Sequence, residues 1–133
     1  MLRLEKHYID EMIAHARQGA PLECCGVLAG RDGRVLKLYR ATNAEHSRYC
    51  YNIEPQELFR INRECEENGW QFLGIYHSHP DSAACPSPTD VRLAALWPES
   101  LYFIVSLLNP KNPEVRAFRI RDGEATEEKL QIV

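Results

Sequence analysis

Two histidines at the end of an apolar run set the strongest limit on the fold of this chain. The run Gln71–Tyr76 is largely apolar, partly aromatic and partly β-branched, a composition typical of a buried strand. Successive side chains of a strand alternate between its faces, so His77 and His79 lie on one face with Cα atoms ~6.5 Å apart. Pro80 has no backbone N–H and should end the strand. The sequence therefore predicts two imidazoles at a strand end, able to converge on one cation.

A helix start follows this strand and brings back a carboxylate. Ser87 is a good N-cap, Pro88 a good first helical residue, and Asp90 falls in the first turn. The same spacing is close to a capping box, in which Ser87 and Asp90 bond only to the backbone of their own helix. Capping and metal binding compete for one carboxylate. With both histidines nearby we favour the metal for Asp90, which leaves Ser87 free to act at a substrate. Two histidines and a carboxylate leave one position of a tetrahedral zinc ion open for water.

Glu23 is a further candidate, because it directly precedes the buried-looking strand that begins at Cys24 and Cys25. An acidic residue in front of a strand is usually exposed to solvent. The alternative is a position at a strand end that faces a pocket. Spacing alone does not place Glu23 beside His77.

The chain has five cysteines, an odd number with no disulfide spacing, so we expect reduced thiols and a cytoplasmic protein. Adjacent Cys24 and Cys25 point to opposite faces of a strand, which argues against a shared metal or an easy disulfide. Together with Cys50 and Cys65 they are expected to be small buried hydrophobic residues. Cys85, in the loop before Ser87, is left open as a soft zinc ligand or an oxidation-sensitive thiol.

Hydrophobic periodicity and turn residues predict both helices and strands along the chain. The expected helices are residues 3–18, 54–68 and 88–96, the last one stopped by Pro98. The expected strands are 23–30, 35–40, 49–53, 71–79, 101–108, 115–120 and 129–133, with hairpin turns at Asp32-Gly33 and Asp122-Gly123. Helices and strands are intermixed, so we expect a single α/β domain over residues 1–133 with a mixed sheet.

Composition narrows the classes of function. The 133 residues suit one domain with one core. A net charge of −3 without a basic cluster argues against a nucleic-acid partner. The longest apolar run, Leu101–Leu108, is far shorter than the ~20 residues of a membrane helix. The first residues lack the apolar core of a signal peptide.

These residues together match a known pattern. The sequence resembles the JAMM (MPN+, Mov34/PAD-1) metallopeptidase family, whose signature is a distant Glu, then His-x-His, seven residues, Ser, two residues and Asp. Here these are Glu23, His77, His79, Ser87 and Asp90, with no departure in spacing. The string Glu-Cys-Cys-Gly-Val-Leu-Ala-Gly is similar to the bacterial branch. The resemblance covers about residues 5–120.

The resemblance implies a mixed sheet flanked by helices, as in cytidine deaminases, around a catalytic zinc. It implies that His77, His79 and Asp90 bind the zinc, with water as the fourth ligand. Glu23 is then the general base that later protonates the leaving amine, and Ser87 donates a hydrogen bond to the oxyanion.

The resemblance also implies a substrate class. The chain is close to the minimal domain, similar to bacterial members that act on the C-terminal Gly-Gly tail of ubiquitin-like sulphur-carrier proteins. We expect the tail to enter as an extended segment between residues 43–53 and 80–87. The alternative is a non-catalytic MPN-type interaction module, but such relatives usually lack one of the five signature residues. A zinc deaminase would need His-x-Glu and Pro-Cys-x-x-Cys, and neither string occurs. The sequence does not indicate an oligomeric state.

Overall fold

The structure, a computed structural model, describes residues 2–97 and 99–133. Its helices are α1 (Lys6–Gly19), α2 (Pro55–Asn68) and α3 (Pro88–Leu93), and α3 continues as the 3-10 turn η1 (Ala94–Leu96). Its strands are β1 (Leu2–Leu4), β2 (Cys25–Arg31), β3 (Arg34–Ala41), β4 (Gln71–His79), β5 (Leu101–Ser106), β6 (Glu114–Arg121), β7 (Glu124–Glu128) and β8 (Leu130–Ile132). None of the helices in the described part of the chain is long and apolar enough to cross a bilayer.

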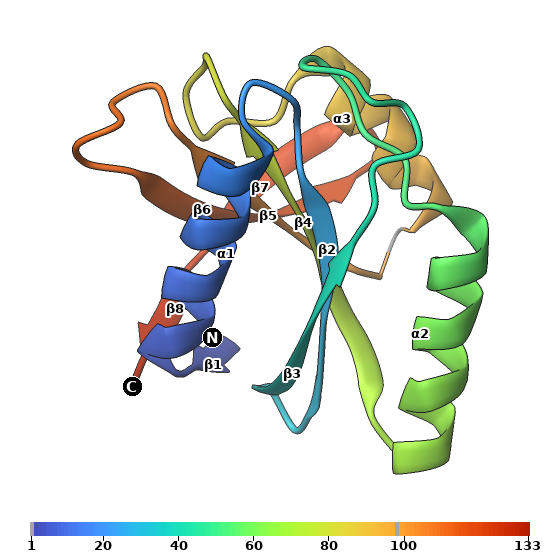
Figure 1. The fold of residues 1–133 in the computed structure, drawn as a ribbon. Helices are drawn as coiled ribbons and strands as arrows, with labels where there is room; N and C mark the ends of the chain where they lie inside the picture. The colour runs from blue at the N-terminus through green and yellow to red at the C-terminus, as the bar shows by residue number, and fades with distance from the viewer. Residues whose placement is uncertain (1, 98) are drawn as a thin grey trace.

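The described strands form one mixed sheet in the order β7-β6-β5-β4-β2-β3-β1-β8. The histidine-bearing strand β4 is central, paired parallel with β5 and antiparallel with β2. Helices α1 and α2 lie on opposite sides of this sheet (Figure 1). The predicted mixed sheet flanked by helices is therefore confirmed.

Each face of the sheet has its own apolar core. Met12 and Ala16 of α1 pack on one face, against residues such as Tyr76. Ile61 of α2 packs on the other face, against residues such as Ile75. Because side chains alternate along β4, His77 and His79 continue the face of Ile75, which α2 and α3 cover.

Local signals explain most of the element boundaries. The Glu54 side chain accepts hydrogen bonds from the backbone N–H groups of Gln56 and Glu57 and so caps α2, as Pro55 at the helix start also favours. Gly69 ends the same helix with φ 67°, a left-handed conformation that favours glycine. These features confirm the predicted second helix.

Three predictions of element type or strand pairing are wrong. Residues 2–4 form β1 rather than the start of a helix, because buried Leu2 and Leu4 alternate with an exposed residue. The predicted strand 49–53 is a loop, in which Ile53 makes only an isolated bridge to Asn43. The predicted strand 129–133 is present as β8, but it does not pair with the strand at 115–120 across the Asp122-Gly123 turn. That place is taken by β7, which was not predicted and which the single residue Lys129 separates from β8. The predicted helix stop at Pro98 lies outside the described residues.

The position of Lys129 has a consequence for the whole sheet. Strand β7 pairs with β6 at one edge, whereas β8 pairs with β1 at the other. Because one residue joins β7 to β8, the two edges of the sheet must come close together. The sheet is therefore strongly curled.

Candidate metal centre and active site

Strand β4 delivers both histidines to its C-terminal end as predicted. The side chains of His77 and His79 are buried. Ladder pairing continues to the last residue of the strand, where the carbonyl of His79 accepts a hydrogen bond from the N–H of Leu107 at 3.1 Å. Neighbouring strands thus fix the backbone that carries both imidazoles.

Asp90 comes to the histidines from the first turn of α3. Its Oδ2 lies 3.1 Å from Nε2 of His77 and 3.0 Å from Nε2 of His79. The same oxygen accepts a hydrogen bond from the N–H of Ser87 at 2.9 Å, while Oγ of Ser87 accepts one from the N–H of Asp90 at 3.1 Å. The expected competition between capping and metal binding is therefore wrong. The capping box orients the carboxylate toward the histidines.

The ligand atoms of His77, His79 and Asp90 all lie within 4.8 Å of one another. Nδ1 of His79 lies 2.9 Å from the carbonyl oxygen of Ala83. If Nδ1–H of His79 donates to this carbonyl, the lone pair of His79 Nε2 faces the carboxylate oxygen of Asp90. Two hydrogen-bond acceptors at this distance repel each other unless a cation or a proton lies between them. Two nitrogens and one oxygen are a donor set that zinc prefers. The residues present therefore fit a zinc ion.

Burial and contacts set the protonation of this group. Burial favours a neutral Asp90, but the contacts with His77 and His79 outweigh it and hold the pKa of Asp90 well below its usual range. Complete burial lowers the pKa of His77. Burial also acts to lower the pKa of His79, but contact with Asp90 and with the Ala83 carbonyl outweighs it and raises that pKa.

Strand register explains the place of Glu23. Cys25 pairs with His77 in the antiparallel ladder, so continuing the register by two residues puts Glu23 opposite His79 on the same face. The Glu23 side chain is buried, and its Oε1 has no hydrogen-bond partner among the described residues. Burial raises the pKa of Glu23 from 4.5 to about 8. A carboxyl group with a pKa near neutrality can both accept and donate a proton.

Two residues of the loop between β3 and α2 belong to the site although the sequence did not predict them. The ring of Tyr51 stacks on His77 with centroids 4.4 Å apart and planes at 20°. Asn43 donates to the carbonyls of Glu23 and Cys50, and its Oδ1 accepts from two backbone N–H groups of the same loop. Tyr51 and Asn43 lie in an irregular, polar loop, and a single aromatic or amide residue there gives no periodic pattern. The sequence therefore carried no signal that could have identified them as part of the site.

None of the cysteines belongs to the metal-ligand group of the described residues. All five are free. Cys24, Cys25 and Cys65 are buried as expected, whereas Cys50 is only half-buried. Burial raises the pKa of Cys24 to about 11 and that of Cys25 to about 12, which makes both thiols poor nucleophiles. Cys85 is exposed and is not in the metal-ligand group of the described residues, so the structure does not support a zinc-ligand role for it.

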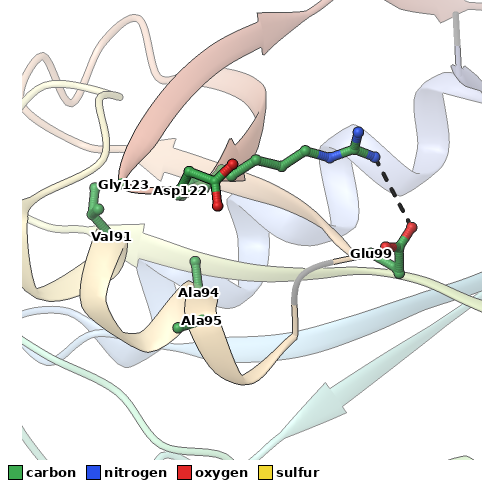
Figure 2. Close-up of a pocket in the computed structure, with 8 residues that line it drawn as sticks. Val91, Ala94, Ala95, Glu99, Asp122 and Gly123 are labelled. Atoms are coloured by element: carbon green, nitrogen blue, oxygen red, sulfur yellow. Dashed lines mark ion pairs between the residues drawn. The ribbon is translucent and has the colours of Figure 1, made fainter.

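The two segments expected to form the substrate cleft are in contact. Arg48 of one segment and Asp81 of the other form an exposed ion pair at 2.8 Å. A separate cavity of about 420 Å³ lies between α3, η1 and the turn from β6 to β7, with Val91, Ala94 and Asp122 in its lining (Figure 2). None of the five signature residues lines that cavity. The expected cleft stays a prediction.

Comparisons with known proteins agree with the signature residues. Residues 5–121 match the family described as prokaryotic homologues of the JAB domain. The chain is 39% identical to the CysO-cysteine peptidase of Mycobacterium tuberculosis, across all of this chain and 92% of that protein. It is 42% identical to the desampylase of Haloferax volcanii, across 73% of this chain and 74% of that protein. Among solved structures, protein DSY2949 of Desulfitobacterium hafniense is similar with a TM-score of 0.90 and 38% identity, across 100% of this chain and 93% of that one.

Proposed function

The chain belongs to the family of prokaryotic homologues of the JAB domain, and from that premise we propose a zinc-dependent peptidase or isopeptidase that acts on conjugates of ubiquitin-like or sulphur-carrier proteins. The resemblance to the bacterial JAMM/MPN+ branch is confirmed, and the chain is a hydrolase of that type. We propose that residues 1–133 form a single metallopeptidase domain.

One observation carries this proposal. Two buried imidazoles and a buried carboxylate point their ligand atoms at one place, and a buried glutamate lies on the same face of the sheet. A structural zinc site is closed by four protein ligands, whereas three ligands leave a position open. His77, His79 and Asp90 would hold the zinc, and Glu23 would act beside it. This donor set supports hydrolysis rather than a structural role.

The chemistry divides between the metal and the chain. When bound, zinc acts as a Lewis acid that lowers the pKa of water from 15.7 to about 7. Glu23 takes a proton from the attacking water while the water oxygen bonds to the scissile carbonyl carbon. Glu23 then gives that proton to the leaving nitrogen as the C–N bond breaks. Burial raises the pKa of Glu23 in the metal-free chain, and a bound cation beside it would lower that pKa and favour the carboxylate that accepts the proton.

Ser87 is suited to stabilise the developing oxyanion. Its side chain is half-buried, and its Oγ already accepts a hydrogen bond from the N–H of Asp90. The hydroxyl proton is therefore still available to donate to a carbonyl oxygen that gains negative charge. One such donor contributes about 3 kcal/mol to transition-state stabilisation.

The substrate class follows from the relatives and from the depth of the site. The names of the two relatives, a CysO-cysteine peptidase and a desampylase, support a conjugate as substrate. Because the ligands are buried, only a slender segment reaches them, and an extended Gly-Gly tail is slender. We propose that the tail passes between residues 43–53 and 80–87, near the ion pair of Arg48 and Asp81. Free cysteines are consistent with a cytoplasmic setting.

The test is a product-mass assay. Zinc-loaded protein is incubated with sulphur-carrier proteins that bear C-terminal extensions, in parallel with carriers joined to a lysine side chain or to a single amino acid. We expect loss of the group after Gly-Gly from at least one of the three, and the preferred one identifies the bond type. Unchanged masses in all three, with zinc bound, would refute the hydrolase and favour the interaction module.

A further inference from the structure

His77 lacks the hydrogen bond that normally orients a ligand histidine. Metal-ligating histidines usually donate their second ring N–H to a carbonyl, carboxylate or water. His79 follows this rule through Nδ1 and the Ala83 carbonyl at 2.9 Å. For His77, Nε2 faces Oδ2 of Asp90 at 3.1 Å, and Nδ1 has no hydrogen-bond partner among residues 2–97 and 99–133. Another contact must therefore fix the plane of its ring.

Tyr51 supplies that contact. Its ring lies against the His77 ring with centroids 4.4 Å apart and an angle of 20° between the planes. The ring of His79 also lies beside His77, edge-on with centroids 5.1 Å apart, but it belongs to a fellow ligand. A stacked ring restricts rotation of the imidazole about its χ2 torsion, which is otherwise broad for histidine. The stacking thus acts where a hydrogen bond is missing.

The loop holds Tyr51 firmly enough for this task. Tyr51 is 6% exposed. On one side of it, the carbonyl of Cys50 accepts a hydrogen bond from Asn43 at 3.0 Å, and on the other side the N–H of Asn52 donates to Asn43 at 3.0 Å. Asn43 also donates to the carbonyl of Glu23 at 3.1 Å. The buried side-chain amide of Asn43 therefore holds the backbone on both sides of Tyr51 and the backbone of Glu23 in fixed relative positions.

We infer that Tyr51 is a positioning residue of the metal centre, whose stacked ring holds His77 in the plane that points Nε2 at the cation. This inference rests on the proposed zinc site. It assigns the effect to the aromatic ring and not to the hydroxyl group. It also gives the otherwise polar loop between β3 and α2 a defined part in metal binding.

The experiment compares three variants with the wild type. Tyr51→Leu removes the ring, Tyr51→Phe keeps it, and Tyr49→Leu is the matched control, because Tyr49 lies in the same loop but is 74% exposed. Zinc affinity is measured by competition with a chromophoric chelator, and ligand geometry by the visible spectrum of the cobalt(II) form. We expect Tyr51→Leu to bind zinc about 10- to 100-fold more weakly and to change the cobalt spectrum. Tyr51→Phe and Tyr49→Leu should match the wild type.

Each other outcome is decisive. If Tyr51→Leu binds zinc with wild-type affinity, the inference is overturned and the proposed function is left intact. The same holds if Tyr51→Phe loses as much zinc affinity as Tyr51→Leu. A wild-type protein that binds no zinc overturns both. If Tyr51→Leu does not fold, the test is instead the NMR chemical shift of the His77 ring protons in the metal-free wild type. The stacked ring should shift them upfield of those of exposed histidines, and unshifted resonances overturn the inference.

Discussion

Replacing Glu23 by Gln should change how the stability of the metal-free protein depends on pH. The folded protein raises the pKa of Glu23 to about 8 from an ordinary value of 4.5. The folded state therefore binds this proton more tightly than the unfolded state does. Its contribution to stability is complete below about pH 4.5 and is lost as the pH rises toward 8.

The size of the effect follows from the two pKa values. Between pH 5 and pH 7, linkage gives a loss of roughly 2–3 kcal/mol in the free energy of unfolding from this one group. Glu23→Gln is neutral at every pH and lacks this loss. Relative to wild type, the variant should therefore gain roughly 2–3 kcal/mol of stability between pH 5 and pH 7.

Urea unfolding at pH 5, 6 and 7, with a chelator present, measures this difference. Titrating groups remote from Glu23 cancel because they are common to both proteins, whereas His79, whose pKa the Glu23 charge helps to raise, adds a smaller part to the difference. Glu45→Gln, at an exposed position in the β3–α2 loop, is the control and should show no such trend. A difference between wild type and Glu23→Gln that stays constant across this range would refute the buried, neutral Glu23. In the zinc-loaded protein, the same substitution should keep one zinc per chain and lower turnover by about 10²- to 10⁴-fold.

Three further substitutions test the rest of the site. His77→Ala should lose zinc and activity together, measured as zinc per chain, and the exposed His7→Ala should lose neither; a variant that keeps its zinc would contradict the ligand set. Ser87→Ala should keep zinc, lower turnover by about 10²- to 10³-fold and cost about 1 kcal/mol of stability, while Thr89→Ala in the same turn should leave turnover unchanged. Asn43→Ala should cost about 3 kcal/mol, because four hydrogen bonds of one buried amide are lost; a change in urea midpoint equivalent to under 1 kcal/mol would contradict its role.

The parts of the fold that follow from local chemistry could be predicted. The Ser87 and Pro88 helix start, the Gly69 helix stop and the alternation that puts His77 and His79 on one face are all short-range. Strand β7 carries no such signal, because Glu124–Glu128 is a polar edge strand with almost every residue exposed. A strand that buries nothing has no hydrophobic alternation to detect.

The site was predictable as a set of residues but not as an arrangement. The sequence supplied Glu23, yet only the pairing of β2 with β4 puts it opposite His79. The sequence also made capping and metal binding rivals for Asp90, whereas the oxygen that accepts the Ser87 N–H also faces both histidines. Tyr51 contacts His77 from an irregular loop, so no periodic sequence pattern could have predicted the contact.

Zinc K-edge X-ray absorption on the zinc-loaded protein tests the central claim most directly. Two imidazoles and a carboxylate predict only nitrogen and oxygen neighbours, at ~2.0–2.2 Å, with the scattering pattern typical of histidine rings. A sulphur neighbour at ~2.3 Å would mean that a cysteine has replaced one of the three ligands. That result would contradict the site built from His77, His79 and Asp90.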